Sequence, residues 1–179
     1  GAPANVAVAA RRLGAQTAFI GKVGQDPFGE SLKHVLDDEG VDTRGLRFDE
    51  HARTTMAVIA MPDANSAEFF FYRNPGADYL LRVNELDIGL LENTKAFHFG
   101  SLSLTNEPAR SATFEAARIA REAGALVSYD VNYRPSLWKE PGQALEVARK
   151  ILPKVDLLKV NEVEVALLAE RETIDPADI

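Results

Sequence analysis

The sequence predicts an α/β protein with a doubly wound, mostly parallel sheet. Short apolar strands alternate with amphipathic helices along the 179 residues. Strands separated by helices of about 10–15 residues imply right-handed crossovers, which place parallel strands side by side. The composition is that of an ordinary globular domain, since 46% of the residues are hydrophobic and 26% are charged. A two-stranded segment interrupts the alternation, and we expect it to form a separate hairpin.

The first helix is predicted within residues 1–14. Gly1 and Pro3 suit a tight turn into the helix, small apolar residues form one stripe, and Gly14 suits the left-handed position that ends a helix. Asn5 is the polar exception. It either caps the helix or points into a cleft where its amide can bind a hydroxylated ligand, and helix physics favours the cap.

The remaining strands and helices follow in turn. Asp26 before Pro27 is typical of a helix start. Strands are expected at residues 17–23, 96–100, 125–130 and 156–160, with a weaker strand at 46–48. Helices are expected from Asp26 to Gly40, from Pro108 to Gly124, from Gly142 to Leu152 and from Asn161 onward. We expect one domain over residues 1–179, incomplete at both ends.

The interrupting segment is predicted to be a lid hairpin at about residues 52–75. Its strands are expected at 54–61 and 68–73, joined by a turn at 62–65. Ligands of open α/β sheets bind outside the carboxyl ends of the strands, where a flap can exclude water. The aromatic run Phe69-Phe70-Phe71 also suits a contact between two copies of the chain, so a homodimer through the lid is a compatible alternative.

Charge and cysteine content exclude several classes of partner and site. The net charge of −7 argues against nucleic acid or an anionic membrane as the main partner. The chain has no cysteine, which removes disulfides and thiolate metal sites and is compatible with a cytoplasmic location. No apolar run approaches the length of a membrane span. Because residue 1 is glycine, we expect a partial sequence.

The amino-terminal pattern resembles the first signature of the ribokinase-like (PfkB) carbohydrate kinases. The pattern is Gly-x-Pro-x-Asn-x-Ala, followed after six residues by Gly14 and after nine more by Gly24. The resemblance implies a ribokinase-like fold, in which Gly1 lies under the sugar and Asn5 binds its hydroxyls. It also implies a small β-sheet lid at the hairpin, and in several members such lids dimerise.

Residues 71–78, Phe-Tyr-Arg-Asn-Pro-Gly-Ala-Asp, resemble the fructokinase branch of this family. The resemblance implies that Arg73 and Asn74 contact the substrate. A solvated strand end is the alternative for a lone arginine after an aromatic run. Related ketodeoxygluconate kinases commonly place a tyrosine two residues before this arginine, where this chain has Phe71.

The strand at 125–130 leads into Asp130-Val-Asn-Tyr-Arg134. On an extended backbone Asp130, Asn132 and Arg134 project to the same side, at the strand end where a site is expected. An Asx-rich turn is the alternative. The phrase, together with Trp138, resembles fructokinases and ketodeoxygluconate kinases, which implies that Asn132 and Arg134 face substrate and phosphate. Trp138 is expected to pack.

Asn161 and Glu164 have the spacing of a capping box, in which each side chain binds the other residue's backbone N–H. The same spacing resembles the Asn-x-x-Glu motif of the family. The resemblance implies that Glu164 helps to order Mg²⁺ through water, beside phosphate at a helix start. Lys159 resembles a lysine near the nucleotide phosphates in many relatives.

The resemblances together imply a fructokinase that transfers the γ-phosphoryl group of ATP to a ketohexose, with Mg²⁺ as cofactor. The family's Gly-Ala-Gly-Asp stretch, which supplies the catalytic-base aspartate, is absent from these 179 residues. No catalytic base is therefore assigned, and the fragment alone is expected to be inactive. The alternatives are a 2-keto-3-deoxygluconate kinase and a non-catalytic sugar-binding or regulatory relative.

Overall fold

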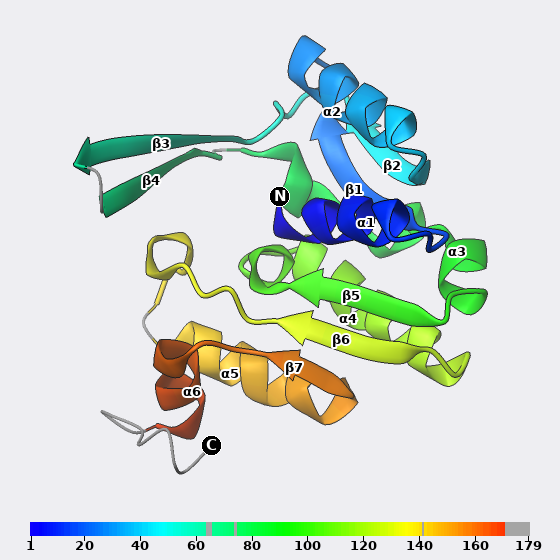
Figure 1. The fold of residues 1–179 in the computed structure, drawn as a ribbon. Coiled ribbons are helices and arrows are strands. Elements are labelled where there is room, and N and C mark those ends of the chain that lie inside the picture. Colours follow the sequence, from blue (N-terminus) through cyan, green and yellow to red (C-terminus); the bar gives the residue numbers. More distant parts are fainter. Residues whose placement is uncertain (64–65, 74, 141, 171–179) are drawn as a thin grey trace. The chain divides into compact units, whose positions relative to one another are not determined.

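The computed structural model describes residues 1–63, 66–73, 75–140 and 142–170 (Figure 1). The chain divides into two compact units, one made largely of residues 1–86 and one of residues 87 onward. The prediction of one kinase domain over 1–179 therefore stays a prediction. Among the described helices, none has both the length and the apolar character that crossing a membrane requires.

The first unit is built on a parallel strand pair. Its elements are α1 (Ala2–Arg12), β1 (Ala18–Gly24), α2 (Pro27–Asp38) and β2 (Asp42–Asp49). β1 and β2 are parallel, with Ile20 opposite Gly45 and Gly24 opposite Asp49. The weak strand predicted at 46–48 is longer than expected, because ladder pairing with β1 stabilises polar residues that propensity alone does not favour.

The helix ends of this unit follow local chemistry, with one correction. Asp26 caps α2 by accepting the Gly29 N–H at 2.9 Å, as predicted. Gly14 has φ 94°, the left-handed conformation expected after a helix. The capping role favoured for Asn5 is wrong. α1 already starts at Ala2 with Gly1 at its N-cap and no side-chain cap, so Asn5 lies in the first helical turn.

The predicted hairpin is confirmed as β3 (Met56–Asp63) and β4 (Ser66–Tyr72), which pair antiparallel and form a ribbon of their own (Figure 1). β3 continues through Pro62 and Asp63, so the turn begins later than predicted, and its residues 64–65 lie outside the described residues. Two short 3-10 helices follow, η1 (Ala77–Leu80) and η2 (Val83–Glu85).

The second unit is a three-stranded parallel sheet with order β5-β6-β7. Its strands are β5 (Ala96–Gly100), β6 (Leu126–Asp130) and β7 (Leu157–Lys159). Its α-helices are α3 (Ile88–Glu92), α4 (Ala109–Glu122), α5 (Gln143–Ile151) and α6 (Glu162–Ala169). Three 3-10 helices lie between them, η3 (Ser101–Leu104), η4 (Pro135–Leu137) and η5 (Leu152–Lys154). The predicted alternation of strand and helix is confirmed here.

A close-packed hydrophobic core supports this sheet. The Phe99 and Tyr129 rings stack with centroids 4.8 Å apart. Val127 and Ile151 are fully buried beside them. Trp138 belongs to the same core, which confirms that it packs. Side chains in such a core are held by many neighbours, so the strand ends above it have fixed positions.

Candidate active site

The three strands of the second unit end level with one another. Gly100 lies opposite Asp130, and Asp130 lies opposite Lys159. Carboxyl ends of parallel strands meet at one edge of a sheet, which is the usual ligand position in α/β folds. The five predicted site residues of this unit lie at or just after these strand ends: Asn132, Arg134, Lys159, Asn161 and Glu164.

The chain turns sharply after β6, which corrects one expectation. The Val131 N–H still donates to the Lys159 carbonyl at 3.1 Å. Asn132 then takes φ 36°, in the left-handed region that asparagine tolerates better than most residues. The extended alternation predicted for Asp130, Asn132 and Arg134 is therefore wrong at Asn132. The alternative of an Asx-rich turn fits better, because the segment has left the strand ladder.

Glu164 is a buried carboxylate at the start of α6. It is 3% exposed, and its Oε2 accepts the Asn161 N–H at 2.9 Å. Asn161 Oδ1 accepts the Glu164 N–H at 2.9 Å, so the predicted capping box is confirmed. Glu164 Oε1 also accepts the Tyr133 N–H at 2.7 Å. Sequence spacing gave no signal for this last contact, because Tyr133 lies on a different segment.

Lys159 and Asp130 form an ion pair across β6 and β7. Lys159 Nζ lies 3.1 Å from Asp130 Oδ1 and 3.2 Å from Oδ2. The lysine side chain is 71% exposed, whereas that of Asp130 is 13% exposed. The carboxylate therefore holds a largely exposed ammonium group at the strand edge.

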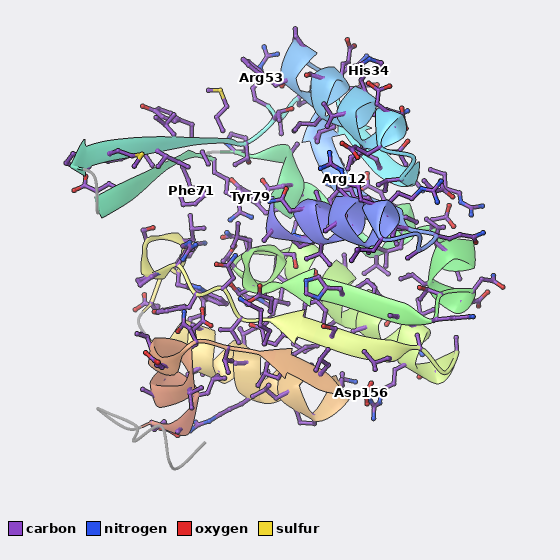
Figure 2. The ribbon with its side chains drawn as sticks, viewed as in Figure 1. Arg12, His34, Arg53, Phe71, Tyr79 and Asp156 are labelled. Carbon is purple, nitrogen blue, oxygen red and sulfur yellow. The ribbon has the colours of Figure 1, made fainter. Side chains whose placement is uncertain are left out.

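In the first unit, Arg73 is held by the segment that follows the hairpin. We call this segment, residues 75–80 with η1, the strap. Arg73 Nη2 and Nε lie 2.6 Å and 2.9 Å from Asp78 Oδ2, and its guanidinium carbon lies 5.0 Å from the centre of the Tyr79 ring. Figure 2 shows Tyr79 on this strap and Phe71 on β4. The Arg73 side chain is 6% exposed. The alternative of a solvated strand end is therefore wrong, because the guanidinium is buried and paired.

The amino-terminal end of α1 lies within electrostatic reach of the same strap. Asp78 interacts electrostatically with the Gly1 end of this helix. Asn5 lies one turn into α1 with an exposed side chain that makes no hydrogen bond to the described residues. Asn74 lies outside the described residues. The first unit thus gathers Gly1 and Arg73, and leaves the Asn5 amide open to solvent.

The pfkB family model of carbohydrate kinases matches residues 1–179. The chain belongs to the pfkB family. It is 49% identical over 175 residues to "Probable fructokinase-3" of Arabidopsis thaliana, which covers 98% of this chain and 51% of that protein. The chain therefore spans about half the length of the curated relatives it matches.

Solved structures of pfkB-type kinases have the same fold. The structure of fructokinase with bound ATP from Xylella fastidiosa aligns with a TM-score of 0.89 at 38% identity, covering 95% of this chain and 54% of that one. The fructokinase from Vibrio cholerae O395 in a form bound to fructose, ADP and calcium ion aligns with a TM-score of 0.85 at 36% identity, covering 97% and 56%. The predicted ribokinase-like fold is confirmed.

Among the described residues, the Glu164 carboxylate suits a divalent cation that is held through water. In the described part of the chain, no three His, Cys, Asp or Glu side chains gather as a metal cluster. Each Glu164 oxygen already accepts one backbone N–H. A carboxylate oxygen has a second lone pair, so Glu164 retains capacity to accept from a metal-bound water.

The first unit also contains a buried polar network around Asp26 and Thr54, which the sequence did not predict. Thr54 donates from its backbone nitrogen and its hydroxyl to the two oxygens of Asp26, each at 2.8 Å. The Gly24 N–H donates to the Thr54 hydroxyl at 3.0 Å. The signature glycine at 24 therefore lies where backbone, carboxylate and hydroxyl meet. The cap sequence of α2 was its one local signal.

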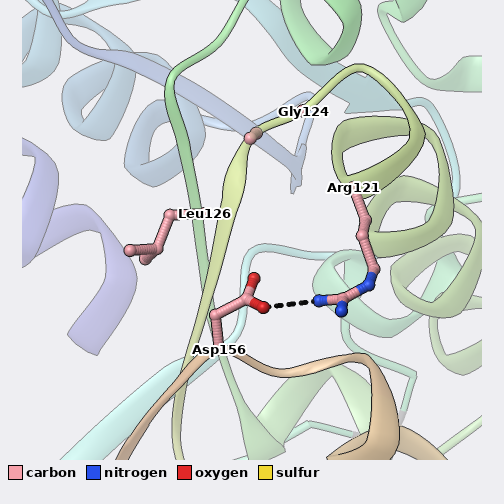
Figure 3. A pocket seen from close by; sticks show the side chains of 5 residues that line it. Arg121, Gly124, Leu126 and Asp156 are labelled. Carbon is pink, nitrogen blue, oxygen red and sulfur yellow. Dashed lines mark hydrogen bonds and ion pairs between the residues drawn. The ribbon is translucent and has the colours of Figure 1, made fainter.

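A shallow pocket lies elsewhere on the second unit, at the amino-terminal end of β6 (Figure 3). It is lined by Arg121, Gly124, Ala125, Leu126 and Asp156. Arg121 spans it to Asp156 with Nη1 2.7 Å from Oδ1. The ion pair joins α4 to the segment before β7, so the two charged side chains that line the pocket are paired with each other. Because ligands of this fold class bind at the opposite ends of the strands, we assign no substrate role here.

Proposed function

We propose that this chain is part of a fructokinase, which transfers the γ-phosphoryl group of ATP to fructose and forms fructose 6-phosphate. The observation that carries the proposal is the 49% identity to a probable fructokinase over 98% of the chain. Relatives whose structures are titled with ATP, or with fructose and ADP, match nearly the whole chain as well.

We propose two sets of binding residues within this function. The sugar side comprises Gly1, Asn5, Arg73, Asn74, Asn132 and Arg134. The phosphate side comprises Lys159, Asn161 and Glu164. Amide groups both donate to and accept from hydroxyls, which suits a polyol, whereas an exposed ammonium suits phosphate oxygens. Support comes from the open Asn5 amide, the held Arg73 guanidinium and the 71% exposed Lys159.

The reaction places its main demands on position and charge. Phosphoryl transfer passes through a state with charge spread over the transferred oxygens, so fixed cations and donors lower its barrier. Lys159 supplies such a cation at the strand edge, and α6, whose amino-terminal end favours negative charge, begins three residues later. Mg²⁺, when bound, would neutralise phosphate charge, with Glu164 orienting its water. The proposal assigns no catalytic base to these residues.

We propose that the hairpin serves as a lid and that it also pairs two copies of the chain. Among the side chains of β3 and β4 that the structure describes, six large apolar or aromatic ones are exposed: Met56, Val58, Ile59, Met61, Phe70 and Tyr72. Alternating residues of a strand face opposite sides, so apolar groups such as Val58 and Ile59 lie on both faces of the ribbon. One face of the ribbon suits contact with the substrate site when the lid closes, and the other face suits contact with a second copy of the chain. Light scattering of wild type and Met61→Glu tests the dimer, which this change should weaken.

We propose a cytoplasmic location, consistent with the absence of cysteine from the 179 residues. Fractionation of cells that express the full-length protein tests it. Recovery in a membrane or organelle fraction would contradict this part of the proposal.

The test of function is a coupled ADP assay on the purified full-length protein. We expect magnesium-dependent ADP formation with fructose, and little with 2-keto-3-deoxygluconate. Preference for the sugar acid would assign the protein to the other branch. Absence of turnover with either sugar, despite binding of fructose measured by calorimetry, would support a non-catalytic sugar-binding relative instead.

A further inference from the structure

The peptide unit between Asn132 and Tyr133 is held at both of its polar groups by buried side chains. The Ser101 hydroxyl donates to the Asn132 carbonyl oxygen at 3.2 Å. Glu164 Oε1 accepts the Tyr133 N–H at 2.7 Å. Ser101 is 1% exposed and Glu164 is 3% exposed. Water therefore has little access to either side chain, so neither hydrogen bond is readily replaced.

The same peptide unit follows a strained residue. Asn132 has φ 36°, in the left-handed region, which asparagine tolerates better than most residues but which still costs free energy that the surroundings offset. The two holding groups come from separate segments, since Ser101 opens η3 after β5 and Glu164 lies in α6 after β7. The turn after β6 is thus fixed from both neighbouring strands.

Glu164 also links this turn to the start of α6. Its Oε2 accepts the Asn161 N–H at 2.9 Å, while its Oε1 serves Tyr133. A single buried carboxylate therefore ties the turn that carries Asn132 and Arg134 to the helix start that carries Asn161. Asn132 and Arg134 belong to the proposed sugar side, and Asn161 belongs to the proposed phosphate side.

We infer that Ser101 and Glu164 are positioning residues, which clamp the Asn132–Tyr133 peptide and so set where the Asn132 and Arg134 side chains stand. This assigns a purpose to Ser101, and it gives Glu164 a task that needs no metal. The clamp is a property of the fold, whereas its effect on sugar binding rests on the proposed function.

Amide hydrogen exchange tests the clamp in the full-length protein without any substrate. Glutamine has one carbonyl oxygen, so Glu164→Gln can accept only one of the two N–H groups. We expect the Tyr133 or the Asn161 amide, followed by NMR, to exchange about tenfold faster or more. The matched control is Glu162→Gln, which removes an exposed carboxylate from the same helical turn and should leave both rates unchanged. Wild-type rates at both amides in Glu164→Gln would overturn the clamp.

Kinetics test its consequence. If the wild type phosphorylates fructose, Ser101→Ala and Glu164→Gln should each raise the KM for fructose about threefold or more. Ser101→Ala should leave the magnesium requirement unchanged. A wild-type fructose KM in Ser101→Ala, with Glu164→Gln altering only the magnesium requirement, would overturn the positioning role. If the wild type phosphorylates no fructose, the proposed function fails, and the exchange rates alone decide the clamp.

Discussion

Arg73 and Asp78 form a partly buried ion pair in which two guanidinium nitrogens reach one carboxylate oxygen, at 2.6 Å and 2.9 Å. The pair closes the strap behind the hairpin over five residues. Its geometry leaves the Arg73 position fixed before any ligand arrives, which lowers the entropy lost on binding. A guanidinium held in this way suits the substrate contact proposed for Arg73.

Arg73→Ala in the full-length protein should lower kcat/KM for fructose about 10- to 150-fold, because a hydrogen bond to a charged group contributes about 1.5–3 kcal/mol. Steady-state kinetics measure the change, and circular dichroism checks the fold. Asp78→Asn is the matched variant, since it weakens the same ion pair but retains the arginine. Equal loss of activity in both variants would mean that Arg73 acts only through the strap.

Lys159→Met should raise the KM for ATP more than the KM for fructose. The ammonium at position 159 is exposed beside Asp130, so its removal takes away the proposed phosphate contact without opening the core. A fivefold or greater rise, about 1 kcal/mol, is expected. Lys150→Met on α5 is the control, since it removes an exposed lysine elsewhere in the same unit. An unchanged KM for ATP would remove Lys159 from the phosphate side.

Gly24→Ala should lower the free energy of unfolding by about 1–3 kcal/mol, as overpacking of a filled site does. A Cβ at this position would lie 2.5 Å from the Thr54 nitrogen and 2.8 Å from the Ala52 oxygen. Urea denaturation measures the loss. Gly142→Ala serves as control, because a Cβ there meets nothing within 4 Å. Equal midpoints for the two variants would show that the site relaxes without cost.

The acid stability of the protein should depend on Asp49. Backbone N–H groups of Ala52 and His51 and the ammonium of Lys22 lower the pKa of its carboxyl from 3.8 to about 2. Since the folded pKa lies below the ordinary value, the stabilisation is present above 3.8 and is lost as the pH falls from there toward 2.

Asp49→Asn should therefore cost about 2 kcal/mol of stability near neutral pH, and the difference from wild type should shrink in acid. Urea midpoints measured over a pH series give the result. Glu50→Gln removes the neighbouring exposed carboxylate and should have no such effect. Parallel curves for wild type and Asp49→Asn would mean that this carboxylate titrates alike in the folded and unfolded chain.

Residues 1–179 expressed alone should form no ADP from ATP and fructose, because no catalytic base is assigned to them. A coupled assay on protein free of host kinases measures this. The full-length protein, prepared in parallel, is the positive control. Fructose-dependent ADP formation by residues 1–179 would place the base within the chain.

Local chemistry was enough to predict most elements and the family. Strand and helix periods, the Asp26 cap, the left-handed Gly14 and the Asn161–Glu164 capping box depend on neighbours within about four residues, which the sequence displays directly. The placement of the candidate residues of the second unit at one edge of the sheet was also predictable, since carboxyl ends of parallel strands share an edge.

Only the tertiary structure decided how those residues are held. The Glu164–Tyr133, Ser101–Asn132 and Thr54–Asp26 contacts join residues 31, 31 and 28 positions apart. No sequence period reports such pairs, because they depend on which segments the sheet brings together. The same limit explains the error at Asn132, where long-range hydrogen bonds from Ser101 and Glu164, rather than local propensity, hold the turn after the strand.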